Sequence, residues 1–345
     1  MNSRKQYGAL DLAKFIAAIL IIVLHTNPFS SYSSILNYGF RSIITIMAVP
    51  FFFLTSGFLF CTKLNSLDEK DKSDYFKKYF KRLGLMYLLW SAVYFIFVAI
   101  DWVTNGVVII DVLQYIKRFF FKGSYSTIWF LPALMTAVTI VYLLRKKLSY
   151  EKIFLLSIPF YVIACFGSSY YGISSKLPII SNLYEAYFSF FETIKNGVLF
   201  GWIYVALGGV LSERSFEKKP IRYLIPTGIF YILIAGETVV QEYLSWSTNG
   251  VDTKFMLIPL TVYLFMFVMS LNIKSGPAFI WMRKLSLLMF LCQRIFLTLF
   301  EWFLQDTIFV ENSMIYFISI LSLTLIFSVI FIKMSEKVKV LKKFY

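Results

Sequence analysis

Apolar runs of about twenty residues recur along the whole length of this chain, beginning with residues 9–29 and 41–61. A run of this length forms a helix that crosses about 30 Å of hydrocarbon. The composition agrees, since 59% of the residues are hydrophobic and 15% are charged, whereas soluble domains average about 45–50% and about 25%. The sequence predicts an all-α polytopic integral membrane protein, with one membrane domain over residues 1–345 and no additional soluble domain.

The hydropathy pattern predicts ten membrane-spanning helices, with boundaries accurate to a few residues. They are residues 9–29, 41–61, 80–100, 127–145, 152–167, 196–212, 221–240, 255–272, 285–304 and 313–333. The first run is longer than a signal peptide and lacks the small-residue cleavage site, so we expect it to remain in the mature protein. Cys61, Cys165 and Cys292 fall in or beside apolar segments without CxxC spacing. They predict packing residues, with neither a disulfide framework nor a metal site.

Positive charge alternates between the connections. With ten helices, basic residues occur at residues 4–5, 63–82, 145–147, 214–222, 283–284 and 333–343, and the opposite loops are mostly acidic. Cytoplasmic loops carry an excess of Lys and Arg, so both termini are expected in the cytoplasm. This signal, and attraction to an anionic inner leaflet, account for the net charge of +15 without a nucleic-acid partner. The long outward loops 101–125 and 167–195 are rich in aromatics; they form interfacial belts or shape an external opening.

The first helix carries His25, the only histidine, together with Asp11 and Lys14. Ionisable residues in a spanning segment are expensive and are hypotheses for a functional site. Lys14 and His25 are eleven residues apart, which places them on nearly the same face and about 16 Å apart along the axis. His25, toward the outer end, suits general acid or base catalysis because its unperturbed pKa is about 6.5. The alternative is a histidine that bonds to a neighbouring helix.

Charged residues also lie near the ends of the first two predicted helices. Lys14 and Asp11, one turn apart near the cytoplasmic end, either pair with each other or leave Lys14 to meet a phosphate or carboxylate of a ligand. In the second helix Pro50 and the Ser56-Gly57 step predict a kink or close packing against the first helix. Arg41, at its outer end, neutralises an oxyanion, binds an anionic acceptor, or snorkels to the interface.

Further polar side chains within the predicted spans are candidates for substrate binding: Trp129, Asn196, Glu237, Gln293 and Arg294. Glu237 and Arg294 have opposite charge, so pairing or a shared wet cavity would avoid exposing them to lipid. The chain has no nucleophile elbow, phosphate loop or zinc spacing. Hydrolase, NTPase and metalloenzyme functions therefore lack support.

The run LDLAKFIAAILIIVLH, followed by VPFFFLTSGFLF, resembles the opening of the acyltransferase family 3 membrane proteins. TIWFLPALM, IKNGVLFGWIYVALGG and RKLSLLMFLCQRIF extend the resemblance over essentially the whole chain. Within the family the sequence is most similar to the membrane domain of vancomycin-resistance serine racemases, which also have a lysine where most members have arginine. The resemblance implies a ten-helix enzyme that O-acylates a surface polysaccharide or related acceptor with cytoplasmic acyl-coenzyme A.

Carried over residue by residue, the family's basic residue and histidine fall on Lys14 and His25, its preceding acidic residue on Asp11, and its arginine before the proline-aromatic stretch on Arg41. Lysine at position 14 lacks the bidentate contact of arginine, and Gln293 stands where many members have a second histidine. The resemblance implies that His25 is the general base and that Lys14, Asp11, Arg82 and Arg145 lie near the phosphates of the donor.

The expected protein is thus a multi-pass transferase of a bacterial plasma membrane, with acyl-CoA, in particular acetyl-CoA, as donor substrate and no permanently bound cofactor. Its expected partners are the donor, an extracytoplasmic glycan or other hydroxyl acceptor, and the lipid bilayer. Two alternatives remain open. One is an amino-acid or small-molecule transporter, in which His25, Glu237 and Arg294 bind substrate. The other is a noncatalytic membrane partner in polysaccharide export.

Overall fold

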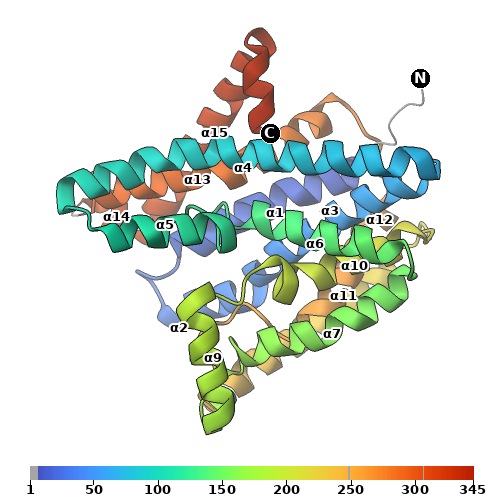
Figure 1. Ribbon diagram of the computed structural model, residues 1–345, viewed down its shortest axis with the longest axis horizontal. Helices are drawn as coiled ribbons and strands as arrows, with labels where there is room; N and C mark the ends of the chain where they lie inside the picture. The colour runs from blue at the N-terminus through green and yellow to red at the C-terminus, as the bar shows by residue number, and fades with distance from the viewer. Residues whose placement is uncertain (1–6, 248, 306) are drawn as a thin grey trace.

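The computed structural model describes residues 7–247, 249–305 and 307–345, which form helices joined by short connections and no strand (Figure 1). In chain order the elements are α1 (Gly8–Thr26), α2 (Ser34–Gly39), η1 (Phe40–Ile44), η2 (Thr45–Met47), α3 (Ala48–Asn65), α4 (Glu69–Asn105), α5 (Ile109–Phe121), α6 (Phe130–Arg145), α7 (Tyr150–Phe166), α8 (Tyr171–Ser174), α9 (Pro178–Phe191), η3 (Gly197–Gly201), α10 (Trp202–Ser212), α11 (Pro220–Tyr243), α12 (Leu257–Ser270), α13 (Pro277–Phe303), α14 (Ile308–Glu311), α15 (Ser313–Lys337) and η4 (Lys339–Phe344).

Six helical segments in the described residues are long and apolar enough to cross a membrane. They are α1, the composite segment Ser34–Asn65, α4, α11, α13 and α15; α6, Gly197–Ser212 and α12 are shorter apolar helices. Each of the ten predicted spans overlaps helix; 41–61 includes η2 and parts of η1 and α3, and 196–212 includes η3 and α10. This arrangement is consistent with a polytopic membrane protein, while the count of ten spans and the cytoplasmic termini stay predictions.

The helix predicted over residues 80–100 is much longer, because α4 also includes most of the basic connector that precedes it. Residues 68–82 contain neither glycine nor proline and are rich in lysine and acidic residues, several of which are good helix formers. The 37 residues of α4 extend over about 55 Å. Figure 1 shows α4 running along most of the length of the molecule.

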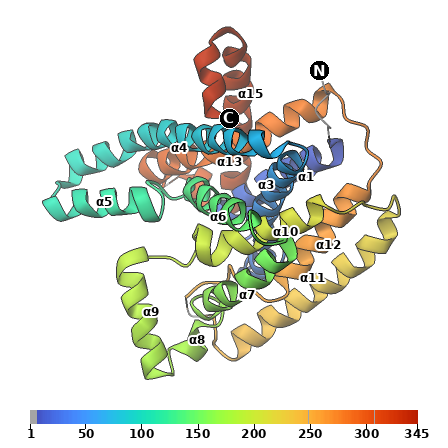
Figure 2. The ribbon, with the colours of Figure 1, turned by 45° about the vertical axis from the view of Figure 1, so that its right-hand side comes forward.

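The outward segments predicted as loops contain helices α5 and α9. In α5, Ile109, Leu113 and Phe120 are exposed, and in α9 Ile179 and Leu183 are exposed. Exposed apolar side chains on an amphipathic helix are typical of a helix that lies in a membrane interface. Figure 2 shows α5 beside one end of α4 and α9 projecting from the same end of the molecule.

The centre of the bundle is the pair α3 and α10, whose backbones approach closely at glycines. A Cβ atom on Gly57 would lie 2.6 Å from the backbone oxygen of Val205, and one on Gly208 would lie 2.4 Å from that of Leu54. Small residues allow such approaches in membranes. The expected kink or close packing against the first helix is found in part: the backbone is irregular over residues 40–47 and α3 contacts α1, but the close neighbour of Gly57 is α10.

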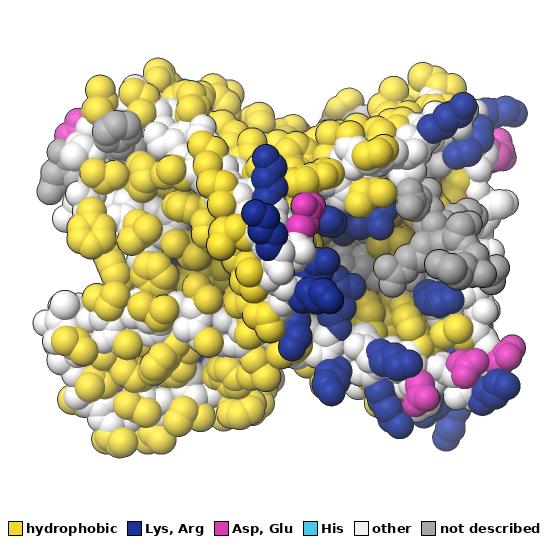
Figure 3. All heavy atoms as spheres, turned by 90° about the horizontal axis from the view of Figure 1, so that it is seen from above, with side chains coloured by type: hydrophobic (Ala, Val, Ile, Leu, Met, Phe, Trp, Pro, Cys, Tyr) yellow, Lys and Arg dark blue, Asp and Glu magenta, His cyan; other side chains and the backbone are white. Residues whose placement is uncertain are grey.

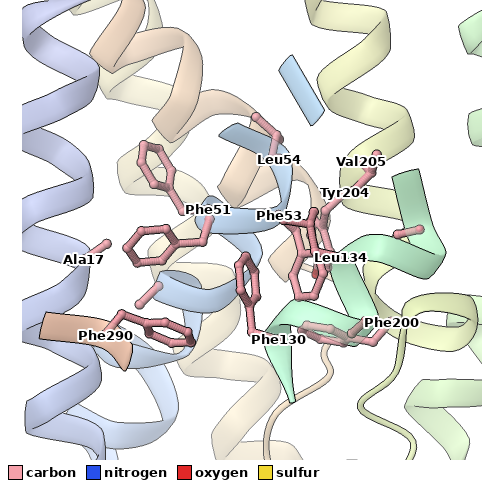
Figure 4. Packing of buried hydrophobic residues seen from close by; sticks show 14 of the residues in the cluster. Ala17, Phe51, Phe53, Leu54, Phe130, Leu134, Phe200, Tyr204, Val205 and Phe290 are labelled. Carbon is pink, nitrogen blue, oxygen red and sulfur yellow. The ribbon is translucent and has the colours of Figure 1, made fainter. Parts of the chain in front are cut away.

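Aromatic side chains from several helices fill the space beside this pair. The ring centroids of Phe53 and Phe130 are 4.6 Å apart, and those of Phe53 and Phe200 are 5.9 Å apart. Figure 4 shows these rings from α3, α6 and η3 meeting, with Phe290 of α13 nearby. Cys61, Cys165 and Cys292 are buried free thiols, as predicted for packing residues.

Charge is distributed unevenly along the length of the molecule. Lys and Arg side chains gather on one half of the face in Figure 3, whereas the other half is dominated by hydrophobic side chains. The basic half corresponds to the end at which α4 begins in Figure 1. This distribution has the form that the positive-inside rule gives to a cytoplasmic end.

Candidate active site

His25 lies in the last turn of α1, where the helix stops. Asn27 adopts a left-handed backbone with φ 48° and donates its N–H to the carbonyl of Val23, and Pro28 follows and cannot continue the helix. His25 is half-buried. Within the described part of the chain its imidazole makes no hydrogen bond, so the alternative of a histidine bonded to a neighbouring helix is not what this structure contains.

Two cavities meet at His25. The outer cavity has a volume of about 810 Å³ and lies among the ends of α4 and α13, helix α5 and the segments 122–129 and 193–195. The inner cavity has a volume of about 70 Å³ and lies against α1 and η2. Three side chains line both cavities: His25, Trp129 and Lys195. We call the place where these three residues meet the neck.

The inner cavity has a mostly apolar wall. Ile21 and Leu24 contribute from α1, Ile46 from η2, and Phe200 and Phe290 from the aromatic core. Its polar lining is limited to Thr45, Thr127 and Asp252 besides His25, Trp129 and Lys195. A water molecule needs about 10–15 Å³ of such volume. The inner cavity therefore has room for a group of only a few non-hydrogen atoms.

A cluster of cations lies beside the outer cavity. The ammonium and guanidinium groups of Lys117, Arg118 and Lys122 lie 3.3, 2.9 and 2.9 Å from the carboxylate of Glu192. Partial burial raises the pKa of Glu192, but the hydrogen bond and charge of Lys122, with Arg118 and Lys117, outweigh it and lower that pKa to about 2. One carboxylate thus faces three cations, of which Arg118 and Lys122 line the cavity. The carboxylates of Asp101, Asp111 and Glu301 also line this cavity, so its wall presents both signs of charge.

The polar residues predicted along the outer half of the spans do not pair as expected. Arg294 makes two hydrogen bonds to Glu301, at 3.0 and 2.8 Å, and both residues line the outer cavity. Glu237 instead accepts hydrogen bonds from Tyr170 and from the backbone N–H groups of Phe255 and Met256. The expected Glu237–Arg294 pair was therefore wrong, and Glu237 does not line the outer cavity with Arg294.

The remaining candidates for substrate binding have distinct surroundings. Trp129 stands at the neck, with its ring centroid 6.1 Å from that of Phe53. Asn196 caps η3, since its side-chain oxygen accepts from the N–H groups of residues 198 and 199. Gln293 is fully buried, and its amide oxygen has no partner in the described residues. Arg41 is exposed and lines neither cavity, although it lies close enough for its charge to act on His25.

At the opposite end of α1, Asp11 pairs with Arg283 of α13 through hydrogen bonds of 2.8 and 2.7 Å. The possible Asp11–Lys14 pair was thus wrong: arginine matches a carboxylate with two parallel N–H groups, which lysine cannot do. The ammonium of Lys14 lies 6.0 Å from the ring centroid of Phe52. Arg283 and Arg82 are close enough for their charges to act on Lys14. Lys14, Asp11 and Arg82 are thus brought together at this end.

Arg145 belongs to a different cluster. Its guanidinium lies 3.0 Å from Glu213 and 4.6 Å from the ring centroid of Tyr150. The cations whose charges act on Lys14 are Arg283 and Arg82, and Arg145 is not among them. Of the residues expected near the donor phosphates, Arg145 is therefore the one that stands apart.

Sequence reasoning missed Lys195 and Asp252, which line the inner cavity and form an ion pair at 2.5 Å. It also missed Arg283, the partner of Asp11, and Lys254, a fully buried lysine whose ammonium bonds to Thr238. The one available signal for Lys195 was its sign: positive charges are rare on the predicted outward side, so each one there merits attention.

Comparison with known proteins identifies the family. The family model of the acyltransferase domain called acyltransferase 3 matches residues 7–333. The chain is similar to an amino-acid racemase of Enterococcus faecalis, with 27% identity over 98% of this chain and 47% of that protein. A serine/alanine racemase of Enterococcus gallinarum is 25% identical over 94% of this chain and 46% of that protein.

This chain thus spans about half the length of the curated relatives that it matches. No solved structure shows significant similarity to it. Because the family model covers nearly all of the residues described above, the chain belongs to the acyltransferase 3 family of membrane acyltransferase domains.

Proposed function

We propose that this protein transfers a short acyl group, such as acetyl, from cytoplasmic acyl-CoA to a hydroxyl of a cell-surface glycan or related acceptor outside a bacterial plasma membrane. The observation that carries the proposal is the position of His25 between a large outer cavity and a small, mostly apolar inner one. The outer cavity has room for part of a polar acceptor. The inner cavity suits a short acyl group by its size.

His25 acts as the general base in this reaction. It takes the proton of the acceptor hydroxyl, and the oxygen attacks the carbonyl carbon of the thioester. An oxygen–carbon bond forms, the carbon–sulfur bond then breaks, and the thiolate of coenzyme A recovers the proton from His25. An imidazole without a hydrogen-bonding partner in the described residues is available for both transfers.

The donor approaches from the cytoplasmic end, where Lys14, Arg82 and Arg283 supply positive charge around Asp11. Phosphates bind such cations. Lys14 and His25 share α1, eleven residues and about 16 Å apart along its axis. Between them Ala17, Ala18 and Phe52 are buried, so we propose that these packed side chains separate when the arm of the donor enters.

The first experiment measures thiol release from acetyl-CoA and longer acyl-CoA molecules by purified protein in nanodiscs, with and without a cell-surface glycan extract. We expect turnover with short acyl groups and its loss in His25→Ala. Lys176→Met, a change on an exposed residue away from both cavities, serves as the matched control. Absence of binding and turnover of every acyl-CoA in folded wild-type protein would refute the proposal.

A second candidate function is the passage of an amino acid across the membrane; the relatives are named as racemases, which act on amino acids. The Arg294–Glu301 pair in the outer cavity presents both charges, which a zwitterion requires. Uptake of radiolabelled serine and alanine by proteoliposomes tests this candidate. Uptake that depends on Arg294, without turnover of acyl-CoA, would favour passage over transfer.

A further inference from the structure

The neck of the site has three residues, and the reaction proposed above assigns a role to two of them. His25 is the base and Trp129 is an aromatic wall, while Lys195 has no assigned role. Nevertheless Lys195 is the one cation that lines both cavities among the described residues. Arg118, Lys122 and Arg294 line the outer cavity alone.

The backbone around Lys195 is held firmly. Its N–H donates to the hydroxyl of Thr193 at 3.0 Å, and the N–H of Asn196 donates to the carbonyl of Ile194 at 2.9 Å. The side chain of Asn196 then caps η3. These hydrogen bonds therefore fix the backbone of Lys195, from which its side chain extends, beside the aromatic core.

Asp252 fixes the other end of this side chain. The ammonium of Lys195 lies 2.5 Å from the carboxylate of Asp252, which comes from the connection between α11 and α12. The next residue, Thr253, bonds through its N–H to Ser169 and through its hydroxyl to the carbonyl of Ala164. Lys195 is thus held between two connections that are each anchored to other parts of the bundle.

The Lys195–Asp252 ion pair is accessible from the cavities. The side chain of Lys195 is 37% exposed and that of Asp252 is 25% exposed, and both line the inner cavity. Burial raises the pKa of Asp252, but the charge of Lys195 outweighs it and the pKa stays below its usual value. A partly exposed ion pair contributes only about 0–1 kcal/mol to stability. The feature that bears on the reaction is therefore the place where the pair holds its ammonium, at the neck beside His25.

Acyl transfer creates a negative charge at this point. When the acceptor oxygen attacks the thioester, the electron pair of the carbonyl moves to oxygen and forms an oxyanion. A fixed cation aimed at such a charge is usually a large contributor to catalysis. His25 carries the proton at this stage, so a second group is needed for the oxyanion.

We propose that Lys195 is a catalytic residue that stabilises this oxyanion, and that Asp252 is the positioning residue that holds its ammonium at the neck. This inference rests on the proposed acyl transfer. The oxyanion is neutralised without any further proton transfer: it collapses to the ester carbonyl as the carbon–sulfur bond breaks. Lys195 stays charged throughout.

The test compares Lys195→Met, Lys195→Arg, Asp252→Asn and the double variant Lys195→Met/Asp252→Leu, with acetyl-CoA as the probe. Thiol release is measured in nanodiscs, and a melting curve is recorded for each variant. We expect Lys195→Met to lower kcat about 10²–10³-fold, the effect of losing one oxyanion donor, with little change in the KM for acetyl-CoA. Lys195→Arg is expected to retain part of the activity, and Asp252→Asn to lower kcat less than Lys195→Met.

The double variant separates catalysis from structure. A merely structural ion pair becomes harmless when both charges are removed together, because neither is left unpaired. The double variant should then melt like the wild type, yet stay as inactive as Lys195→Met. If its kcat returns to the wild-type value, or if Lys195→Met is fully active, Lys195 is not the oxyanion residue. Should Lys195→Met fail to fold, the double variant and Lys195→Arg decide the question by the same comparison.

The two proposals fail in different ways. A wild-type protein without acyl-CoA turnover removes both of them. A wild-type protein that loses its turnover in His25→Ala but keeps it in Lys195→Met removes only the role of Lys195. Lys176→Met again controls for the loss of one positive charge on an exposed site.

Discussion

Replacing Asp11 by asparagine tests the pairing at the cytoplasmic end of α1. Asp11 is 5% exposed and accepts hydrogen bonds of 2.8 and 2.7 Å from Arg283, whose side chain is 38% exposed. Hydrogen bonds to charged groups contribute about 1.5–3 kcal/mol each. Asparagine keeps one acceptor oxygen, and water reaches Arg283, so we expect the free energy of unfolding to fall by about 2 kcal/mol.

The assay is reversible unfolding in mixed micelles, with the folded fraction followed by tryptophan fluorescence. Asp11→Leu/Arg283→Met serves as the control, because removing both charges leaves neither unpaired. We expect the double variant to recover most of the lost stability. Its KM for acetyl-CoA should stay near the wild-type value, because one negative and one positive charge are lost together beside Lys14. Asp11→Asn with wild-type stability would refute the assigned pairing energy.

Three further predictions concern other parts of the molecule. Lys14→Arg should keep the KM for acetyl-CoA near the wild-type value, and Lys14→Met should raise it about tenfold, or 1.4 kcal/mol. Gly208→Ala should destabilise by about 1–3 kcal/mol because its Cβ would lie 2.4 Å from the α3 backbone, whereas Gly228→Ala, with open space, should not. Glu192, with its pKa lowered from 4.5 to about 2, stabilises the protein above pH 4.5; melting curves should show this stabilisation disappearing as pH falls toward 2, with Glu192→Gln lacking it throughout.

Hydropathy was enough to locate helix at each predicted span, because the membrane requires the same length and polarity from every spanning segment, but it did not predict α5 and α9. The same argument located His25, since an ionisable residue that remains in a span must have a reason to be there. Trp129 emerged from a family-like segment. Both residues line the two cavities, although the local sequence did not indicate that they would lie at the same place.

Local sequence patterns did not predict contacts between residues that are far apart in the chain. Asp11 and Arg283 are 272 positions apart, and no periodic pattern connects them. The pair Arg294–Glu301 is different, because the two residues lie seven positions apart within one helix. That spacing is about two turns and places both side chains on one face of the helix, a local signal that the expectation of a Glu237–Arg294 pair did not use.

Segments of irregular backbone line the inner cavity, and the local sequence does not clearly predict them. The chain forms π-helical turns at Phe40–Ile44 and Gly197–Gly201, and a tight turn at Thr45–Met47. Residues from these segments, Thr45, Ile46 and Phe200, line the inner cavity. At membrane depth such backbone is tolerated where it is buried in protein or lines a cavity, since lipid satisfies no polar group. The regular packing of the helices is interrupted at these turns. The inner cavity that results is where we propose that the acyl group lies beside His25.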